Sequence, residues 1–285
     1  MGKEVEALFE DVHVHAELAH VLQQEGRWAE ALHHARRVVA LAPRGSVLHL
    51  WGYAKAATIA ADMGRGQLAH RFATVYLALA RGASGVEQYT PWVQQAMGIA
   101  CYQRGRFQEA IAWYRRAVQG FARCGLTEQV AVASSMLAFN LARIGRPQRA
   151  RACLADRSEF PESRSYLYDS AMTAIHMAEG DHELAVSSGR RALTASGRRS
   201  FDFADAAAVA LLVSRALRAL GARREATAFI LSAARFAVRQ RWEVLAPLLP
   251  NRGQRGGDMA REAAVSRGRG SAHPRDGASL CPGCG

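Results

Sequence analysis

Two cysteines near the end of the sequence have the spacing of a metal-binding pair. Cys281 and Cys284 stand in the sequence Cys-Pro-Gly-Cys-Gly, and thiolates at this separation can ligate one zinc ion. A structural zinc site needs four ligands, and the sequence has no second pair of this kind. Two chains could share a four-cysteine site, or a longer chain could supply the other ligands, but we favour a free, exposed pair.

A stripe of carboxylates and imidazoles runs along the first predicted helix. Glu10, His13, Glu17 and His20 follow one another at spacings of three, four and three residues, so they share one helix face. Glu-x-x-His pairs also occur in the di-iron sites of helical bundles, but those sites take ligands from several helices. Because both pairs lie on one helix here, the pattern favours a polar stripe over a metal site.

Arginine carries nearly all of the positive charge. The sequence has 37 basic and 25 acidic residues, a formal net charge of +12. Three arginine pairs occupy matching places in alternate repeats, between apolar positions, so we expect them on an outer face. They could form a basic ridge for an acidic partner or phosphates, but we favour a solvated face that pairs with nearby acids. The pairs are Arg36 and Arg37, Arg115 and Arg116, and Arg190 and Arg191.

The last 35 residues differ in composition from the rest. Residues 251–285 contain eight glycines, six arginines and no aromatic residue, and the apolar periodicity stops there. This composition predicts a disordered tail. Arg-Gly segments can associate with RNA, but the aromatic residues that usually stack on bases are missing, so we do not expect nucleic acid as a partner.

Several classes of protein are not expected from this sequence. No apolar run approaches the roughly 18–20 residues that cross a bilayer, and the acidic N-terminus does not fit a signal peptide. Five scattered cysteines make no disulfide framework, which predicts a cytoplasmic protein without a membrane partner. Because we find no phosphate-binding loop and no His-Glu-x-x-His motif, we expect neither an enzyme nor a cofactor.

The elements that position these side chains are predicted to be helices. Apolar residues recur at every third and fourth position, and a larger pattern repeats six times with a glycine in each unit. An alanine follows each glycine by five residues, and a small residue precedes it by seven. The glycine would supply the positive φ of a turn between two helices, and the small residues would let those helices approach closely. The glycines, 35 to 41 residues apart, are Gly26, Gly64, Gly105, Gly145, Gly180 and Gly221.

Two of these units resemble the tetratricopeptide repeat family, in a long-period form of bacterial type. The small, glycine, aromatic and alanine positions of the family are occupied by Ala19, Gly26, Trp28 and Ala31 in the first unit, and by Gly98, Gly105, Phe107 and Ala110 in the third. Most units exceed the usual ~34 residues. The resemblance implies an all-α fold, a right-handed α-solenoid of about six helix-turn-helix repeats over residues 1–250.

In tetratricopeptide proteins the first helix of each pair lines a concave groove. The aromatic residues that the resemblance places there could grip an extended peptide, and glutamine and arginine could bond its backbone or termini. Alternatively, the aromatic residues only pack between repeats. The Lys/Asn clamp that some members use for C-terminal carboxylates is absent. The candidate groove residues are His20, Trp51, Trp92, Gln95, Ile99, Tyr102, Phe139, Arg143 and Arg215.

Three hypotheses of function follow. The favoured one is a non-enzymatic scaffold whose groove binds a protein or peptide. The second is a peptide- or ligand-sensing module of a bacterial transcriptional or signalling regulator. The third and weakest is a metal-binding protein that uses Cys281 and Cys284. A homodimer is compatible with each of them.

Overall fold

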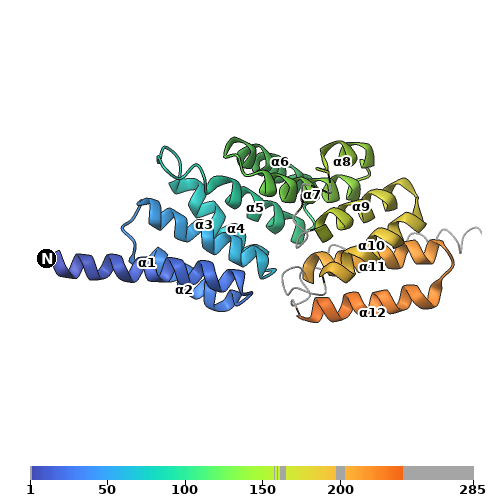
Figure 1. The fold of residues 1–285 in the computed structure, drawn as a ribbon, viewed down its shortest axis with the longest axis horizontal. Coiled ribbons are helices and arrows are strands. Elements are labelled where there is room, and N and C mark those ends of the chain that lie inside the picture. Colours follow the sequence, from blue (N-terminus) through green and yellow to red (C-terminus); the bar gives the residue numbers. More distant parts are fainter. Residues whose placement is uncertain (1, 157, 159, 161–164, 197–202, 240–285) are drawn as a thin grey trace, which may run out of the picture. The chain divides into compact units, whose positions relative to one another are not determined.

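The computed structural model describes residues 2–156, 158, 160, 165–196 and 203–239, which contain helices and no strand (Figure 1). The helices are α1 (Gly2–Gln24), α2 (Trp28–Leu41), α3 (Val47–Asp62), α4 (Gly66–Leu79), α5 (Thr90–Gln103), α6 (Phe107–Arg123), α7 (Thr127–Arg143), α8 (Pro147–Cys153), α9 (Ser165–Glu179), α10 (His182–Ser196), α11 (Phe203–Ala219) and α12 (Arg223–Arg239).

These helices form six consecutive pairs. Each helix packs against the next one along the chain, from α1 against α2 to α11 against α12. The arrangement confirms the predicted fold class, an all-α solenoid of six helix-turn-helix repeats. The predicted tail, with its boundary near residue 250, lies outside the described residues and stays a prediction.

The predicted turn glycines all adopt the left-handed backbone conformation. Their φ values run from 72° at Gly64 to 86° at Gly180. At Gly105 the turn closes α5, because the Gly105 N–H donates to the Tyr102 carbonyl and the Arg106 N–H to the Cys101 carbonyl, each at 2.9 Å. An L-residue at such a φ costs about 1 kcal/mol or more, so glycine is favoured at each of these turns.

Small residues let the paired helices approach, as predicted. A Cβ atom added to Gly98 of α5 would lie 2.7 Å from Cε1 of Tyr114 of α6, which is far inside van der Waals contact. The alanines that follow the turn glycines by five residues are completely buried. They are Ala31, Ala69, Ala110, Ala150, Ala185 and Ala226.

The first helices of the pairs build one side of the array. We call the side built by α1, α3, α5, α7, α9 and α11 the first-helix face. Along this face α3 packs on α5, α7 on α9 and α9 on α11, whereas the backbones of α5 and α7 are not a closely packed pair. Long side chains join these two helices, and the ring centroids of Tyr102 and Phe139 lie 5.9 Å apart.

Candidate functional site

Arg143, in the last turn of α7, lies against an aromatic cluster. Its guanidinium carbon is 5.2 Å from the ring centroid of Phe107, the first residue of α6. The Phe107 ring is 6.0 Å from that of Tyr102 in α5. The carbonyl end of α7 is compatible with a cation in its last turn. Three consecutive helices therefore position this one guanidinium.

The charge of Arg143 is not balanced by a neighbouring acid. No carboxylate of the described residues lies within 4 Å of its guanidinium nitrogens, although the side chain is half-buried. Burial lowers the pKa of Arg143, Tyr102 acts in the opposite direction, and the charge of Arg215 in α11 lowers it further. An arginine remains protonated despite such a shift, so the face carries a partly desolvated cation with a second arginine nearby.

Gln95 of α5 brings a hydrogen-bond acceptor to the same region. Its Nε2 donates to the sulfur of Met136 in α7 at 3.7 Å, a weak bond, while its Oε1 is buried and has no partner among the described residues. Ile99, one turn further along α5, packs against two clusters of buried apolar residues. The amide is therefore loosely held and could bond a ligand N–H after a small rotation.

At the other end of the array, His20 of α1 meets a residue that the sequence analysis missed. The Nζ of Lys55 in α3 lies 2.9 Å from Nδ1 of His20 and 5.8 Å from the ring centroid of Trp51. Lys55 follows Trp51 by one helical turn, which is a signal that could have placed it on the same face. The predicted residues His20 and Trp51 thus come together, with Lys55 between them.

Three of the predicted groove aromatics are packing residues instead. Tyr102 and Phe139 are each 6% exposed. The half-buried Trp92 ring lies edge-to-face on Phe121 of α6, with centroids 5.0 Å apart, beside Ala133 of α7. These contacts match the alternative interpretation, in which the aromatic residues pack between repeats, although Tyr102 also lies near Arg143. Trp51 lies beside Lys55.

The first two of the three arginine pairs are exposed, as expected for an outer face. Arg36 and Arg37 in α2, and Arg115 and Arg116 in α6, all face solvent. The guanidinium carbon of Arg116 lies 4.7 Å from the ring centroid of Trp113 on the same helix. This stacked arginine on a second helix resembles Arg143 in its chemistry but not in its location.

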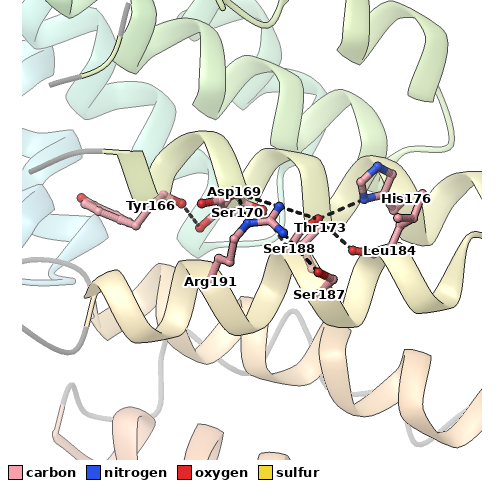
Figure 2. Close-up of polar contacts among 9 residues, drawn as sticks. All are labelled: Tyr166, Asp169, Ser170, Thr173, His176, Leu184, Ser187, Ser188 and Arg191. Carbon is pink, nitrogen blue, oxygen red and sulfur yellow. Dashed lines mark hydrogen bonds and ion pairs between the residues drawn. The ribbon is translucent and has the colours of Figure 1, made fainter. Parts of the chain in front are cut away.

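The third pair differs from the first two, because both arginines bind acids, here on other helices. Arg190 forms an ion pair with Glu225 of α12. Arg191 reaches from α10 to α9, where its Nε donates to Oδ1 of Asp169 at 3.0 Å (Figure 2). Asp169 is only 2% exposed, so Arg191 is part of a helix contact and not of a free basic surface.

The same helix contact contains a histidine and a serine at the distance of a nucleophile–base pair. Nδ1 of His176 lies 3.1 Å from Oγ of Ser188, as Figure 2 shows. The Ser188 hydroxyl donates to the Leu184 carbonyl at 2.8 Å, and the residue is 1% exposed. A substrate cannot reach this oxygen, so the pair joins α9 to α10 and gives no support for hydrolytic chemistry.

Metal-ligating side chains do not converge within the described residues. No group of three or more histidine, cysteine or acidic side chains there could hold a metal ion. Cys101, Cys124 and Cys153 are free, and burial raises the pKa of the Cys153 thiol to about 11, which disfavours the thiolate that binds metal. Cys281 and Cys284 lie outside the described residues.

The helices can also be compared with those that span membranes. Within the described residues, no helix combines the length and the apolar character that crossing a membrane requires.

Comparison with known families agrees with the repeat pattern. Residues 87–163, which span α5 to α8, match a family model described as tetratricopeptide repeat. No curated protein sequence matches the chain.

Three solved structures have a similar fold. Aspartyl phosphate phosphatase F from Bacillus subtilis aligns at 12% identity with a TM-score of 0.60, over 80% of this chain and 60% of that one. The Rap conjugation gene regulator of the plasmid pLS20, in complex with the Phr* peptide, aligns at 12% identity with a TM-score of 0.61, over 88% and 80%. A Rap protein complexed with competence and sporulation factor aligns at 10% identity with a TM-score of 0.56, over 90% and 76%. At such identities the likeness concerns the fold alone.

Proposed function

We propose that the chain is a non-enzymatic scaffold, since residues 87–163 match a tetratricopeptide repeat model and the other described helices continue the same array. It binds an acidic segment of a protein or peptide on its first-helix face. Helical repeat arrays present long continuous surfaces of this kind to extended ligands. The proposed contact residues are Gln95, Arg143 and Arg215, with Ile99 beside them.

The observation behind this proposal is the half-buried guanidinium of Arg143. Its stacking on Phe107 contributes roughly 0.5–2 kcal/mol, but a ring face leaves most of the five N–H donors unbonded. A carboxylate matches the planar fork of these donors and would neutralise a charge that is costly to bury alone. Arg215 adds a second positive charge to the same region, which favours an anionic ligand further.

Gln95 supplies a second type of contact. A peptide bound along α5 and α7 presents backbone N–H groups, and the unpartnered Oε1 of Gln95 could accept one of them. The weak Met136 contact of its Nε2 leaves the amide free to rotate. A ligand that binds Arg143 through a carboxylate and Gln95 through an N–H group has the functional groups of a peptide, whereas an isolated anion has no N–H group to donate.

A short free peptide is the second candidate, as in the sensing module of a regulator. Two of the structures with a similar fold contain the Phr* peptide and competence and sporulation factor, respectively. This chain spans 60% of the phosphatase F structure, and the activity in that protein's name does not extend to the scaffold proposed here. A free peptide would engage its own terminal carboxylate, whereas a protein segment would use side-chain carboxylates.

Selection from a random peptide library displayed on phage tests the proposal with the full chain. We expect the selected peptides to be rich in Asp and Glu, and their affinity to fall at least about tenfold in Arg143→Gln, equivalent to roughly 1.4 kcal/mol. Arg116→Gln is the matched control, because Arg116 is also stacked on an aromatic ring but lies on a second helix. Amidating the peptide C-terminus distinguishes terminal from side-chain recognition.

Two results would overturn the proposal. One is a selection that yields no peptide above background. The other is a set of peptides whose affinity is the same for the wild-type protein and for Arg143→Gln.

A further inference from the structure

Lys55 is a half-buried amine that forms no ion pair within the described residues. It projects from α3 toward α1, where its Nζ lies 2.9 Å from Nδ1 of His20. The ring of Trp51 covers it at 5.8 Å, and no carboxylate of the described residues lies within 4 Å of Nζ. The group in direct contact with this amine is therefore an imidazole, and the nearest acids act from beyond 4 Å.

Two contacts involve the ring nitrogens of His20. A lysine ammonium can only donate, so Nδ1 of His20 accepts from Lys55. Nε2 lies 2.9 Å from the side-chain amide nitrogen of Gln24, so a proton on Nε2 requires that amide to turn its oxygen toward the ring. The charge of Lys55 lowers the pKa of His20, burial lowers it further, and Glu17 acts in the opposite direction. At neutral pH the imidazole is uncharged and presents a basic nitrogen to the amine.

The surroundings also favour the neutral form of Lys55. Burial lowers its pKa from 10.5 to about 8, although Asp62 of α3 and Glu17 of α1 both act to raise it. The carboxylate of Asp62 accepts a hydrogen bond from Nε2 of Gln23 at 2.7 Å. At pH 7.5 about a quarter of Lys55 would be the free amine, against roughly one part in a thousand for an ordinary lysine.

We propose that Lys55 is an acyl-acceptor site, which takes an acyl group from a small activated donor, an acyl phosphate or a thioester, while His20 receives the proton. The Nζ lone pair attacks the carbonyl carbon and forms a C–N bond. The bond from that carbon to the phosphate oxygen or thioester sulfur breaks, and the leaving group takes the electron pair. The proton released by nitrogen passes to Nδ1 of His20.

This site does not depend on the proposed peptide binding, because it lies between α1 and α3 and uses none of the same residues. Its consequence is electrostatic. Acylation converts Lys55 to a neutral amide and removes one positive charge from the first-helix face. The only other lysine of the sequence is Lys3, so the acylation rate of Lys55 can be compared with that of a second lysine in the same molecule.

The test exposes the full chain to acetyl phosphate, or separately to a small acetyl thioester, over a range of pH. After denaturation, the amines that have not reacted are acetylated with an isotopically heavy reagent. Mass spectrometry then gives, for Lys55 and for Lys3, the fraction of molecules that carries the unlabelled acetyl group. We expect Lys55 to react at least about tenfold faster than Lys3 at pH 7.5. Its rate should level off near pH 8. Reaction with one donor or both supports the proposal and identifies the donor class.

Two variants distinguish the contribution of the Lys55 amine from that of the neighbouring His20. Lys55→Arg should abolish the fast reaction, and His20→Gln should slow it several-fold because the proton acceptor is lost. The proposal is wrong if Lys55 reacts no faster than Lys3 with either donor, or if its rate continues to rise up to pH 10. An unchanged rate in His20→Gln would remove His20 from the mechanism.

Discussion

Arg191 shows that an exposed arginine can be a structural residue. About half of its side chain is exposed, but its guanidinium binds Asp169, whose side chain is 2% exposed. It also donates to Oγ of Ser187 at 3.1 Å. Removing one partner of such a pair leaves a buried charge with less compensation, which costs far more than losing a surface pair.

We therefore expect Arg191→Gln to reduce the free energy of unfolding by about 2–4 kcal/mol. Urea denaturation followed by circular dichroism measures this loss. The matched control is Arg190→Gln, which removes the exposed pair with Glu225 and should cost less than about 1 kcal/mol. Equal losses in the two variants would contradict the structural role of Arg191.

The residues of the site could be predicted only in part from the sequence. Arg143 and His20 lie on first helices, as the sequence predicts, since the turn glycines set the register of each helix. The partner of Arg191 lies 22 residues away on another helix, and Lys55 lies 35 residues from His20. Spacing within one helix cannot reveal contacts of this kind.

At the scale of elements, the crossing of α5 and α6 depends on Gly98. A methyl group there would lie within 2.9 Å of three atoms of the Tyr114 ring, and Tyr114 is itself buried in the core. Gly98→Ala should destabilise the protein by about 1–3 kcal/mol through overpacking, as measured by thermal or urea unfolding. Adding Tyr114→Leu should recover part of this loss. Additive losses would instead show that the two residues are not coupled.

The contact between α1 and α2 contains a pair of histidines that responds to acid. Nδ1 of His15 lies 2.7 Å from Nδ1 of His34, so one nitrogen must accept and cannot be protonated. Burial, together with His15 and His33, lowers the pKa of His34 below its usual 6.5. The folded protein then binds fewer protons than the unfolded chain, and stability falls as the pH drops below about 6.5.

The pH dependence of the melting temperature should therefore differ between the wild-type protein and a variant without His34. The melting temperature of the wild type should fall between pH 7.5 and pH 5.5, and it should fall less in His34→Gln, which lacks the titrating group. His176, whose pKa is also lowered by burial, provides a second acid-sensitive contact in both proteins. A fall of equal size in both would exclude the His15–His34 pair as a source of acid sensitivity.

The elements were more predictable than the site. Turn glycines, buried alanines and small residues at helix crossings repeat at fixed spacings, and local backbone and packing rules are enough to interpret them. The role of an aromatic side chain depends on how far neighbouring helices approach. Trp92 therefore proved to pack against Phe121, although its helix position alone was compatible with a groove.

At the scale of the whole array, positive charge is held at two separate places on the first-helix face. Lys55 lies between α1 and α3, and Arg143 lies between α5, α6 and α7 with Arg215 nearby. Neither Lys55 nor Arg143 has a carboxylate within 4 Å among the described residues. The net charge of +12 thus includes cations that an acidic ligand could neutralise, in addition to those exposed on second helices.

The most direct test of this account is the ratio of affinities of one acidic peptide for Arg143→Gln and for Arg116→Gln, measured by calorimetry with the full chain. We predict that Arg143→Gln weakens binding at least about tenfold, while Arg116→Gln leaves it within about twofold, because only Arg143 lies on the first-helix face. Equal affinities for the two variants would contradict the account.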